Sequence, residues 1–298
     1  MTLNLLTNLF QYIIFPLLIT MSKLKGIVIS LRPHQWIKNL FIFAPLIFSK
    51  YAIHLYPILK EITAFFIFSL LSGSVYIIND ICDIEYDRKH PIKKARPIAS
   101  GIIKPKDALI FSFSLIIITL SLSYILSKYF FIVAFIYLLI NLFYSLKLKT
   151  IPFLDVVVIA TGFGLRIIAG AFVIEVNPSL WLIICGFLLS LFLAFGKRRH
   201  EISLKGADQQ RKVLKAYSEK GLDLALYSTG ILTTIAYISY CLSSHTRIFF
   251  NTKYMILTSP FVIFGLFRYI KIVKRGKDAQ SPTEAMIHDF PFLINIAL

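Results

Sequence analysis

Long apolar runs separated by short polar gaps occupy almost the whole sequence. A run of about 20 mainly apolar residues is what an α-helix needs to cross the hydrocarbon core of a bilayer. Bounded by charged residues, Pro or Gly, the runs predict helices at 36–50, 61–80, 107–127, 129–146, 154–174, 179–195, 222–243 and 253–270, and a ninth from about residue 285 that is cut short at Leu298. The expected fold is therefore all-α, a polytopic membrane bundle of about nine transmembrane helices.

Lys and Arg residues gather in alternate gaps between these runs. The segments 23–38, 86–106, 147–149, 197–220 and 268–277 hold 26 of the 32 basic residues. Because cytoplasmic loops of membrane proteins are enriched in Lys and Arg, this alternation supports the helix count. It also predicts that these five segments face the cytosol from the inner (plasma) membrane. The net charge of +17 then needs no nucleic-acid partner.

The composition of the chain and its first 21 residues bear on the domain organisation. With 57% hydrophobic and 16% charged residues, the chain is too apolar for a soluble domain, which carries about 25% charge. Residues 22–298 are therefore interpreted as a single membrane domain. Residues 1–21 are apolar but lack the basic start and cleavage site of a signal peptide, so they are either an extra helix or translation upstream of Met21.

Four side chains with metal-ligating oxygens follow one another at the end of the second predicted helix. Asn79, Asp80, Asp83 and Asp87 have the spacing at which the three carboxylates share one face over about two turns of an α-helix. Hard oxygen donors of this kind suit Mg²⁺, which commonly binds carboxylates together with substrate phosphates. The competing interpretation is a solvated acidic helix end that pairs with its basic neighbours.

A basic loop stiffened by two prolines follows at once. It runs from His90 to Gly101 and contains Lys94 and Arg96. Guanidinium and ammonium groups bind phosphate, so the loop can contact a phosphate that the aspartate-bound metal also touches. Acidic motif and basic loop are therefore expected to act as one site.

The two segments together carry a resemblance. The pattern Asn-Asp-x-x-Asp-x-x-x-Asp, followed by Arg-Pro-Ile-Ala-Ser-Gly at 96–101, is similar to the first signature of the UbiA superfamily of intramembrane prenyltransferases. The resemblance implies a nine-helix UbiA-like bundle with a Mg²⁺-diphosphate site. It covers residues 31–292.

One departure from that family indicates a branch within it. UbiA-type prenyltransferases carry a second Asp-x-x-x-Asp cluster near the end of the sixth helix, where this chain has Gly196-Lys197-Arg198. That run, with the motifs at 31–39, 144–149, 154–155 and 165–170, resembles the polyprenyl-phosphate phosphoribosyltransferase branch. The resemblance implies catalytic and metal-binding roles for Asp80, Asp83 and Asp87, with Asn79 as a further ligand of Mg²⁺.

The other candidate residues are polar or basic side chains in these motifs. We expect them to bind substrate; they are Lys38, Asn79, Lys94, Arg96, Tyr144, Lys147, Arg166, Lys197, Arg198 and Glu201. Several have an alternative explanation: Lys38 as a topogenic charge, Arg166 as a structural residue, and Glu201 as part of a solvated loop. Arg166 lies eleven residues after Asp155, so both project from nearly the same helix face.

The expected function is transfer of 5-phosphoribose from 5-phosphoribosyl diphosphate to a polyprenyl (decaprenyl-type) phosphate for cell-envelope glycan precursors. The donor is soluble, whereas the tail of the acceptor lipid stays in the bilayer. The first alternative is a UbiA-type enzyme that moves a prenyl group from its diphosphate to an aromatic acceptor. The second is a non-catalytic transporter or lipid-binding protein. The ionisable clusters argue against it, because they gather at one membrane face, whereas transporters tend to have helices broken at the midplane of the membrane. Acceptor chain length and oligomeric state stay open.

Overall fold

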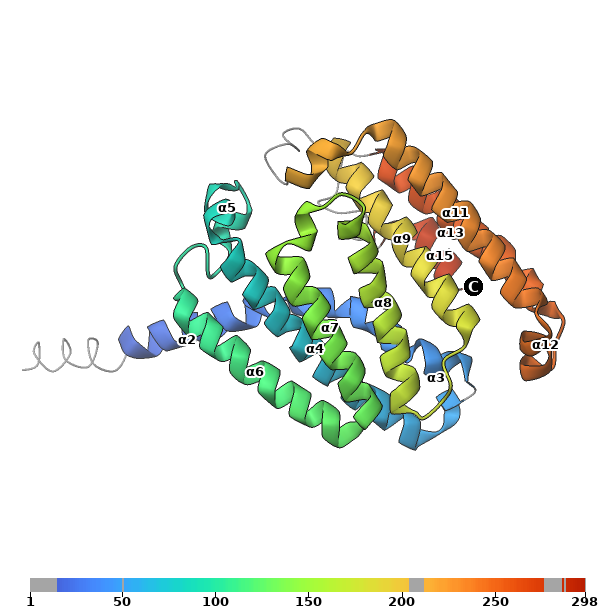
Figure 1. Ribbon diagram of the computed structural model, residues 1–298, viewed down its shortest axis with the longest axis horizontal. Coiled ribbons are helices and arrows are strands. Elements are labelled where there is room, and N and C mark those ends of the chain that lie inside the picture. Colours follow the sequence, from blue (N-terminus) through green and yellow to red (C-terminus); the bar gives the residue numbers. More distant parts are fainter. Residues whose placement is uncertain (1–14, 50, 204–211, 276–285, 287, 298) are drawn as a thin grey trace, which may run out of the picture. The chain divides into compact units, whose positions relative to one another are not determined.

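The computed structural model describes residues 15–49, 51–203, 212–275, 286 and 288–297 (Figure 1). Throughout this part of the chain the regular secondary structure is helical, without strands. Seven helical segments are long and apolar enough to cross a membrane: Leu55–Cys82 (α4), Pro105–Leu126 (α6), Lys128–Leu146 (α7), Leu154–Val173 (α8), Leu180–Ser203 (α9), Glu219–Leu242 (α11) and Tyr254–Arg275 (η7 and α13). The protein is thus an integral membrane protein, and the all-α prediction is confirmed with nine as an approximate count.

The first predicted helix, 36–50, is not continuous. It is a 3-10 helix, Pro33–Phe43 (η2), followed by a short α-helix, Ala44–Phe48 (α3). Pro45 lies in the first turn of α3, where a missing N–H is tolerated. The buried Asn39 amide donates to the hydroxyls of Ser69 and Ser72 on α4 at 2.9 and 3.2 Å. Cross-helix hydrogen bonding therefore fixes this segment against α4.

Both ends of the predicted pattern also differ in detail. A helix, Phe15–Ser30 (α2), runs without a break through Met21. At the other end, α15 covers Phe290–Ala297, too short at 1.5 Å per residue to cross a bilayer. The sequence Ser281-Pro282-Thr283-Glu284 has the pattern of a capping box, and the basic segment 199–220 could form a lid or a membrane-surface helix. The first of these segments and residues 204–211 of the second lie outside the described residues.

The chain divides into two compact units. The first comprises Met1–Leu146 and Phe172–Ile174, and the second comprises Lys147–Ala171 and Glu175–Leu298. In the first, α4 packs against α6 and α7 (Figure 1), and two short helices, Ile84–Lys89 (α5) and Lys93–Ala95 (η4), follow α4.

Helix α6 shows why the first unit is stable in lipid. Its large apolar side chains, such as Phe113 and Ile117, are exposed, whereas Ser112 and Thr119 are buried. Ser112 Oγ donates to the carbonyl of Ser74 on α4 at 3.0 Å. Small and polar residues face the neighbouring helix, and apolar ones face outward, as expected when lipid is the solvent.

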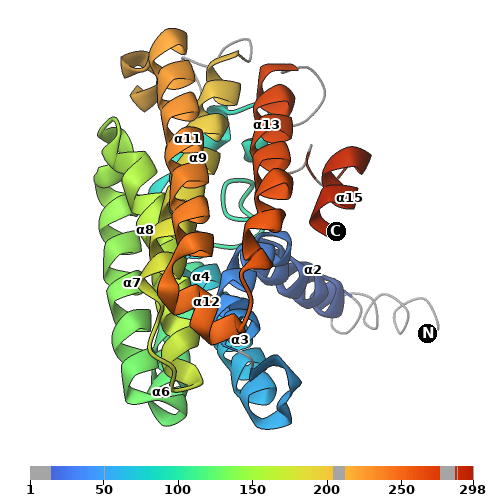
Figure 2. The same cartoon turned by 90° about the vertical axis from the view of Figure 1, so that its right-hand side faces the viewer.

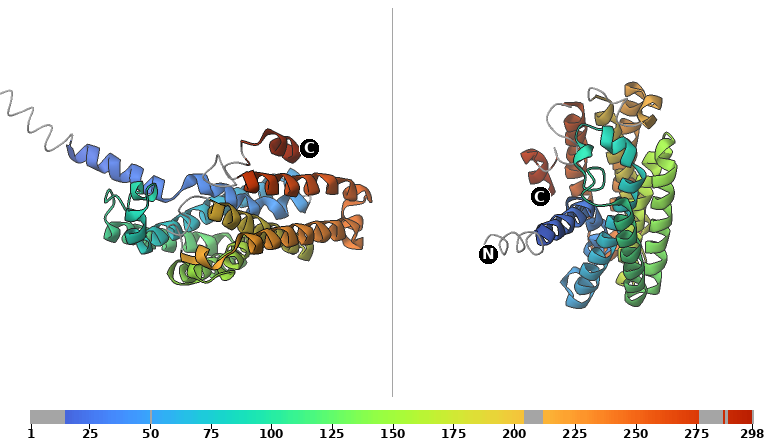
Figure 3. Two further views of the ribbon diagram at one scale, coloured as in Figure 1. Left: turned by 90° about the horizontal axis from the view of Figure 1, so that it is seen from above. Right: turned by 90° about the vertical axis from the view of Figure 1, so that its left-hand side faces the viewer.

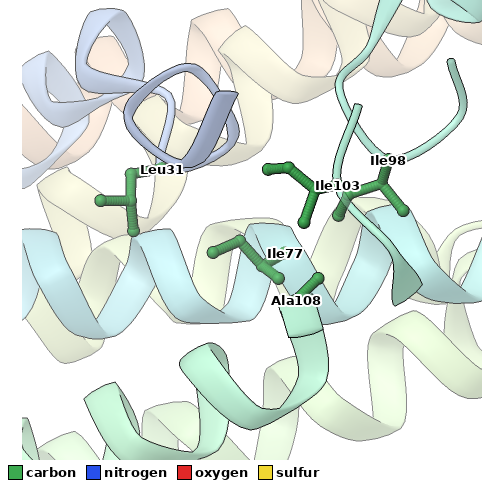
Figure 4. Packing of buried hydrophobic residues seen from close by; sticks show 5 residues of the cluster. All are labelled: Leu31, Ile77, Ile98, Ile103 and Ala108. Atoms are coloured by element: carbon green, nitrogen blue, oxygen red, sulfur yellow. The ribbon is translucent and has the colours of Figure 1, made fainter. Parts of the chain in front are cut away.

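An apolar cluster fixes the basic loop on the helices. Leu31, Ile77, Ile98, Ile103 and Ala108 are all buried and point toward one another (Figure 4). Leu31 directly follows α2, Ile77 is on α4, Ile98 is in the basic loop, Ile103 lies between that loop and α6, and Ala108 is on α6. The loop that carries the candidate phosphate-binding residues is therefore held at the end of α4 by burial of Ile98 and of the adjoining Ile103.

In the second unit, α9 packs against α11 and α13, which run side by side (Figure 2), and α15 lies against α13 (Figure 3). A short helix, Ser244–Phe250 (α12), follows α11. Gly196 permits the close approach of α13, because a Cβ there would lie 2.4 Å from Tyr269 Cε1. The buried Tyr269 hydroxyl donates to the carbonyl of Leu193 at 2.8 Å.

Candidate active site

Arg32 joins the start of η2 to the end of α4. Its guanidinium forms an ion pair with Asp80 and lies 5.1 Å from the centre of the Tyr76 ring. The backbone of Arg32 is left-handed, with φ +52°, directly before Pro33. Such a conformation costs about 1–3 kcal/mol in a residue other than glycine. Arg32 adopts this conformation between α2 and η2, and its side chain reaches Asp80.

Arg96 draws two carboxylates together. Its Nη1 donates to Asp80 Oδ1 at 3.0 Å and to Asp87 Oδ2 at 2.6 Å. Both aspartates are 3% exposed, and charge-assisted bonds of this length are strong. Asp80 thus accepts from two arginines, Arg32 and Arg96, that come from opposite sides of it in the sequence.

The predicted single acidic helix is interrupted. Asp83 ends α4 with φ −101° and ψ 6° and precedes α5, so Asp80 and Asp87 lie on different helices. Asn79 Nδ2 donates to Asp83 Oδ2 at 3.1 Å. Among the described residues, no three His, Cys, Asp or Glu side chains are grouped closely enough to hold a metal ion. The expectation of three carboxylates converging on one continuous helix is therefore wrong.

The donor set nevertheless fits Mg²⁺ in its chemistry. A single nitrogen of Arg96 lies within hydrogen-bonding distance of Asp80 and Asp87 at once, so a positive charge is already accommodated between two carboxylates. Asn79 lies on α4, and Asp83, to which it donates a hydrogen bond, caps the end of that helix. Asn79, Asp80, Asp83 and Asp87 stay our predicted ligands, and we call these four residues with Arg32 and Arg96 the aspartate site.

Three other predicted substrate-binding residues lie in the first unit. Lys94 is exposed on η4, in the same loop as Arg96, whereas Lys38 is half-buried on η2. Tyr144 is half-buried near the end of α7. Lys94 thus shares its loop with a member of the aspartate site, and the roles of Lys38 and Tyr144 stay predictions.

The second unit contains a buried ionic cluster around Arg198, on α9. Arg198 Nε donates to Asp155 Oδ2 at 2.7 Å, and its Nη1 donates to Glu201 Oε2 at 2.6 Å. Tyr217 donates from its hydroxyl to Asp155 Oδ1 at 2.6 Å and accepts from the backbone N–H of Phe153. Burial, and then the bond to Asp155, raises the pKa of Tyr217. We call Asp155, Arg198, Glu201 and Tyr217 the Arg198 cluster.

The cations at the end of α9 therefore have carboxylate partners. Arg199 Nε donates to Asp223 at 2.9 Å, and its Nη2 donates to Glu219 at 3.0 Å, as Arg198 does to Asp155 and Glu201. Besides Glu201 of α9 itself, Asp155 on α8 and Glu219 and Asp223 on α11 bring carboxylates to the end of this helix.

The remaining candidates are placed as follows. Arg166 is buried on α8 and donates to the carbonyl of Gly162 at 2.8 Å. Its guanidinium also lies 5.3 Å from the centre of the Phe163 ring. Lys147 is exposed beside η5 (Leu148–Thr150), and Lys197 is half-buried on α9.

Sequence reasoning gave no site role to Arg32, Asp155 or Tyr217. Arg32 carried a signal, because it precedes a proline within one of the motifs. Asp155 had one too, as an acidic residue at the start of an apolar run. Tyr217 had none, since it bonds to a residue 62 positions away.

The comparisons with known proteins agree with this architecture. Residues 40–294 match the model of the UbiA prenyltransferase family. The chain is 31% identical to the decaprenyl-phosphate phosphoribosyltransferase of Corynebacterium glutamicum, covering 89% of this chain and 81% of that protein. It is 29% identical to the enzyme of the same name from Mycobacterium tuberculosis, covering 89% and 88% of the two chains.

Solved structures show the same fold. A UbiA homolog from Archaeoglobus fulgidus bound to GPP and Mg²⁺ superposes with a TM-score of 0.69 over 91% of this chain and 93% of its own, at 17% identity. A structure of digeranylgeranylglyceryl phosphate synthase gives 0.60 at 24% identity, over 85% and 95% of the two chains. The resemblance found in the motifs is confirmed, and the chain belongs to the UbiA prenyltransferase family.

Proposed function

We propose that this protein transfers the 5-phosphoribosyl group from 5-phosphoribosyl diphosphate to the phosphate of a polyprenyl phosphate. The observation that carries the proposal is the similarity to decaprenyl-phosphate phosphoribosyltransferases over most of both chains. In this reaction an oxygen of the lipid phosphate forms a bond to the anomeric carbon. The bond from that carbon to the diphosphate breaks, and the diphosphate leaves with the electron pair.

The aspartate site has the groups that such a reaction needs. Bound Mg²⁺ would supply positive charge to the departing diphosphate, and Asn79, Asp80, Asp83 and Asp87 are the residues that would hold it. Arg96 lies beside two of those carboxylates, so its charge is at the site and can also stabilise the departing diphosphate.

No strong general base is required, because the attacking phosphate oxygen is already ionised at neutral pH. Positioning of the two substrates contributes more. We therefore assign Lys94 and Arg96 to the diphosphate and interpret Arg32 as the residue that orients Asp80. For Arg198 we favour a positioning role, since both of its observed partners are carboxylates of the same chain.

The location of the acceptor follows from the apolar surface. Exposed residues such as Phe113, Ile117 and Ile125 on α6 are suited to contact acyl chains, so the polyprenyl tail is expected to enter from the bilayer. The enrichment of Lys and Arg in the loops next to the aspartate site supports a cytosolic orientation, from which a soluble donor can bind.

Transfer of label from water to lipid tests this function. Membranes containing the protein are incubated with 5-phosphoribosyl diphosphate labelled in the ribose, Mg²⁺ and polyprenyl phosphate, and lipid-extractable label is counted. Wild type should transfer label, and Asp83→Asn should not. Asp107→Asn, which removes an exposed carboxylate at the start of α6, is the control and should retain activity.

Two results would contradict the proposal. Label that stays aqueous while a prenyl diphosphate is consumed with an aromatic acceptor would assign the chain to the prenyl-transferring members of the family. Full activity of Asp83→Asn would exclude the aspartate site as the reaction centre.

A further inference from the structure

A histidine beside the aspartate site has a fixed ring orientation. His90 follows α5 and precedes Pro91, and its Nδ1 accepts from the backbone N–H groups of Ile92 at 3.2 Å and Lys93 at 3.3 Å. A nitrogen that accepts two hydrogen bonds carries no proton. The neutral imidazole therefore has its proton on Nε2, which makes Nε2 a donor.

That donor is enclosed by protein and unused. Nε2 of His90 is buried, and among the described residues it has no hydrogen-bond partner. Buried polar groups in native proteins are nearly always hydrogen-bonded, so an exception calls for an explanation, such as a ligand that completes the bond.

The surroundings of His90 indicate the charge of that ligand. Burial lowers the pKa of His90, as do Lys93 and Arg96, while Asp87 raises it. Two residues of the aspartate site, Asp87 and Arg96, are thus close enough to act on the ring electrostatically. The ring is a neutral donor in a loop rich in cations, and it suits an acceptor that brings negative charge.

We propose that His90 Nε2 donates a hydrogen bond to a phosphate oxygen of the diphosphate bound at the aspartate site. Diphosphate oxygens are acceptors, which is what this donor requires, and Asp87 Oδ2 already accepts from Arg96 at 2.6 Å. His90 is then a positioning residue that orients the leaving group. The inference rests on the proposed function only in requiring a diphosphate-containing substrate.

A simpler role for His90 is to close the turn through the hydrogen bonds of Nδ1 alone. Two substitutions distinguish this structural role from donation by Nε2. In His90→Asn the side-chain oxygen takes the place of Nδ1, so the turn is kept and the donor is lost. In His90→Gln the amide nitrogen takes the place of Nε2, so the donor is kept and the turn bonds are lost. His54, exposed at the opposite end of α4 from Asp80, receives the same two substitutions as a control.

The measurement is binding of inorganic pyrophosphate with Mg²⁺ to the purified full-length protein, by calorimetry and by protection against heat unfolding. His90→Asn should bind pyrophosphate about tenfold more weakly, the loss expected for one hydrogen bond to a charged group, at an unchanged unfolding temperature without ligand. His90→Gln should bind within about threefold of wild type and unfold at a lower temperature. The His54 variants should match wild type in binding.

Other outcomes decide between the two proposals. Wild-type affinity in His90→Asn, or equal weakening in both His90 variants, would overturn the inference, as would a wild type that does not bind pyrophosphate. If the His90 pattern is found but only prenyl diphosphates are turned over, the inference stands and the phosphoribosyl assignment fails.

Discussion

Arg198 gives the sharpest stability prediction, because it is 1% exposed and its Asp155 partner is 0% exposed. In Arg198→Met the buried Asp155 loses a bond of 2.7 Å, and Glu201 loses one of 2.6 Å. Removing one partner of a buried ion pair typically costs about 3–5 kcal/mol, since the other charge is left uncompensated. Tyr217 still donates to Asp155, and Glu201 is 15% exposed. We therefore expect a loss near the lower limit, about 3 kcal/mol.

The assay is unfolding of the purified protein in detergent micelles, for Arg198→Met, Asp155→Leu and the double variant. The double variant removes both charges, so it should recover most of the stability lost in the single variants, with a coupling energy of at least about 2 kcal/mol. Arg275→Met, which changes an exposed arginine at the end of α13, should unfold as wild type does. The reasoning is refuted if Arg198→Met has wild-type stability but about a tenfold higher KM for the phosphorylated donor, because Arg198 would then serve the substrate.

Three further substitutions test single contacts. Arg32→Gly removes an ion pair to Asp80 but relieves the strain of a positive φ. It should lower kcat/KM about tenfold and the free energy of unfolding by less than about 2 kcal/mol. Unchanged kinetics would show that Asp80 needs no orienting partner. Gly196→Ala should destabilise by about 1–3 kcal/mol, measured as a lower unfolding temperature, because the new methyl group would lie 2.6 Å from the Tyr269 hydroxyl; wild-type unfolding would contradict the close packing. Glu61 is 0% exposed on α4, and neither of its carboxyl oxygens has a hydrogen-bond partner among the described residues. Glu61→Met should therefore raise the free energy of unfolding by about 1–3 kcal/mol. A lower free energy of unfolding would reveal a partner of the carboxyl group.

Much of this architecture could be predicted from local pattern. Apolar runs of the length of a bilayer determine that the chain is helical and lies in the membrane, because lipid leaves few other ways to satisfy the backbone. The acidic motif and the basic loop are separated by a few residues, so their proximity follows from chain connectivity. Arg96 contacts Asp87 only nine positions away.

The tertiary structure decided the contacts that join distant segments. Arg32 reaches Asp80 across 48 positions, and Arg198 reaches Asp155 across 43. These partners depend on how the helices pack and on the left-handed backbone conformation at Arg32. Neither can be predicted from the periodicity of the sequence. The break at Asp83 is another example: the spacing predicted a continuous helix face, yet the chain turns there and Arg96 brings Asp80 and Asp87 together. Local sequence thus determined which residues are charged and near a helix end, while packing determined which opposite charges meet, because pairing buried ions depends on geometry in three dimensions.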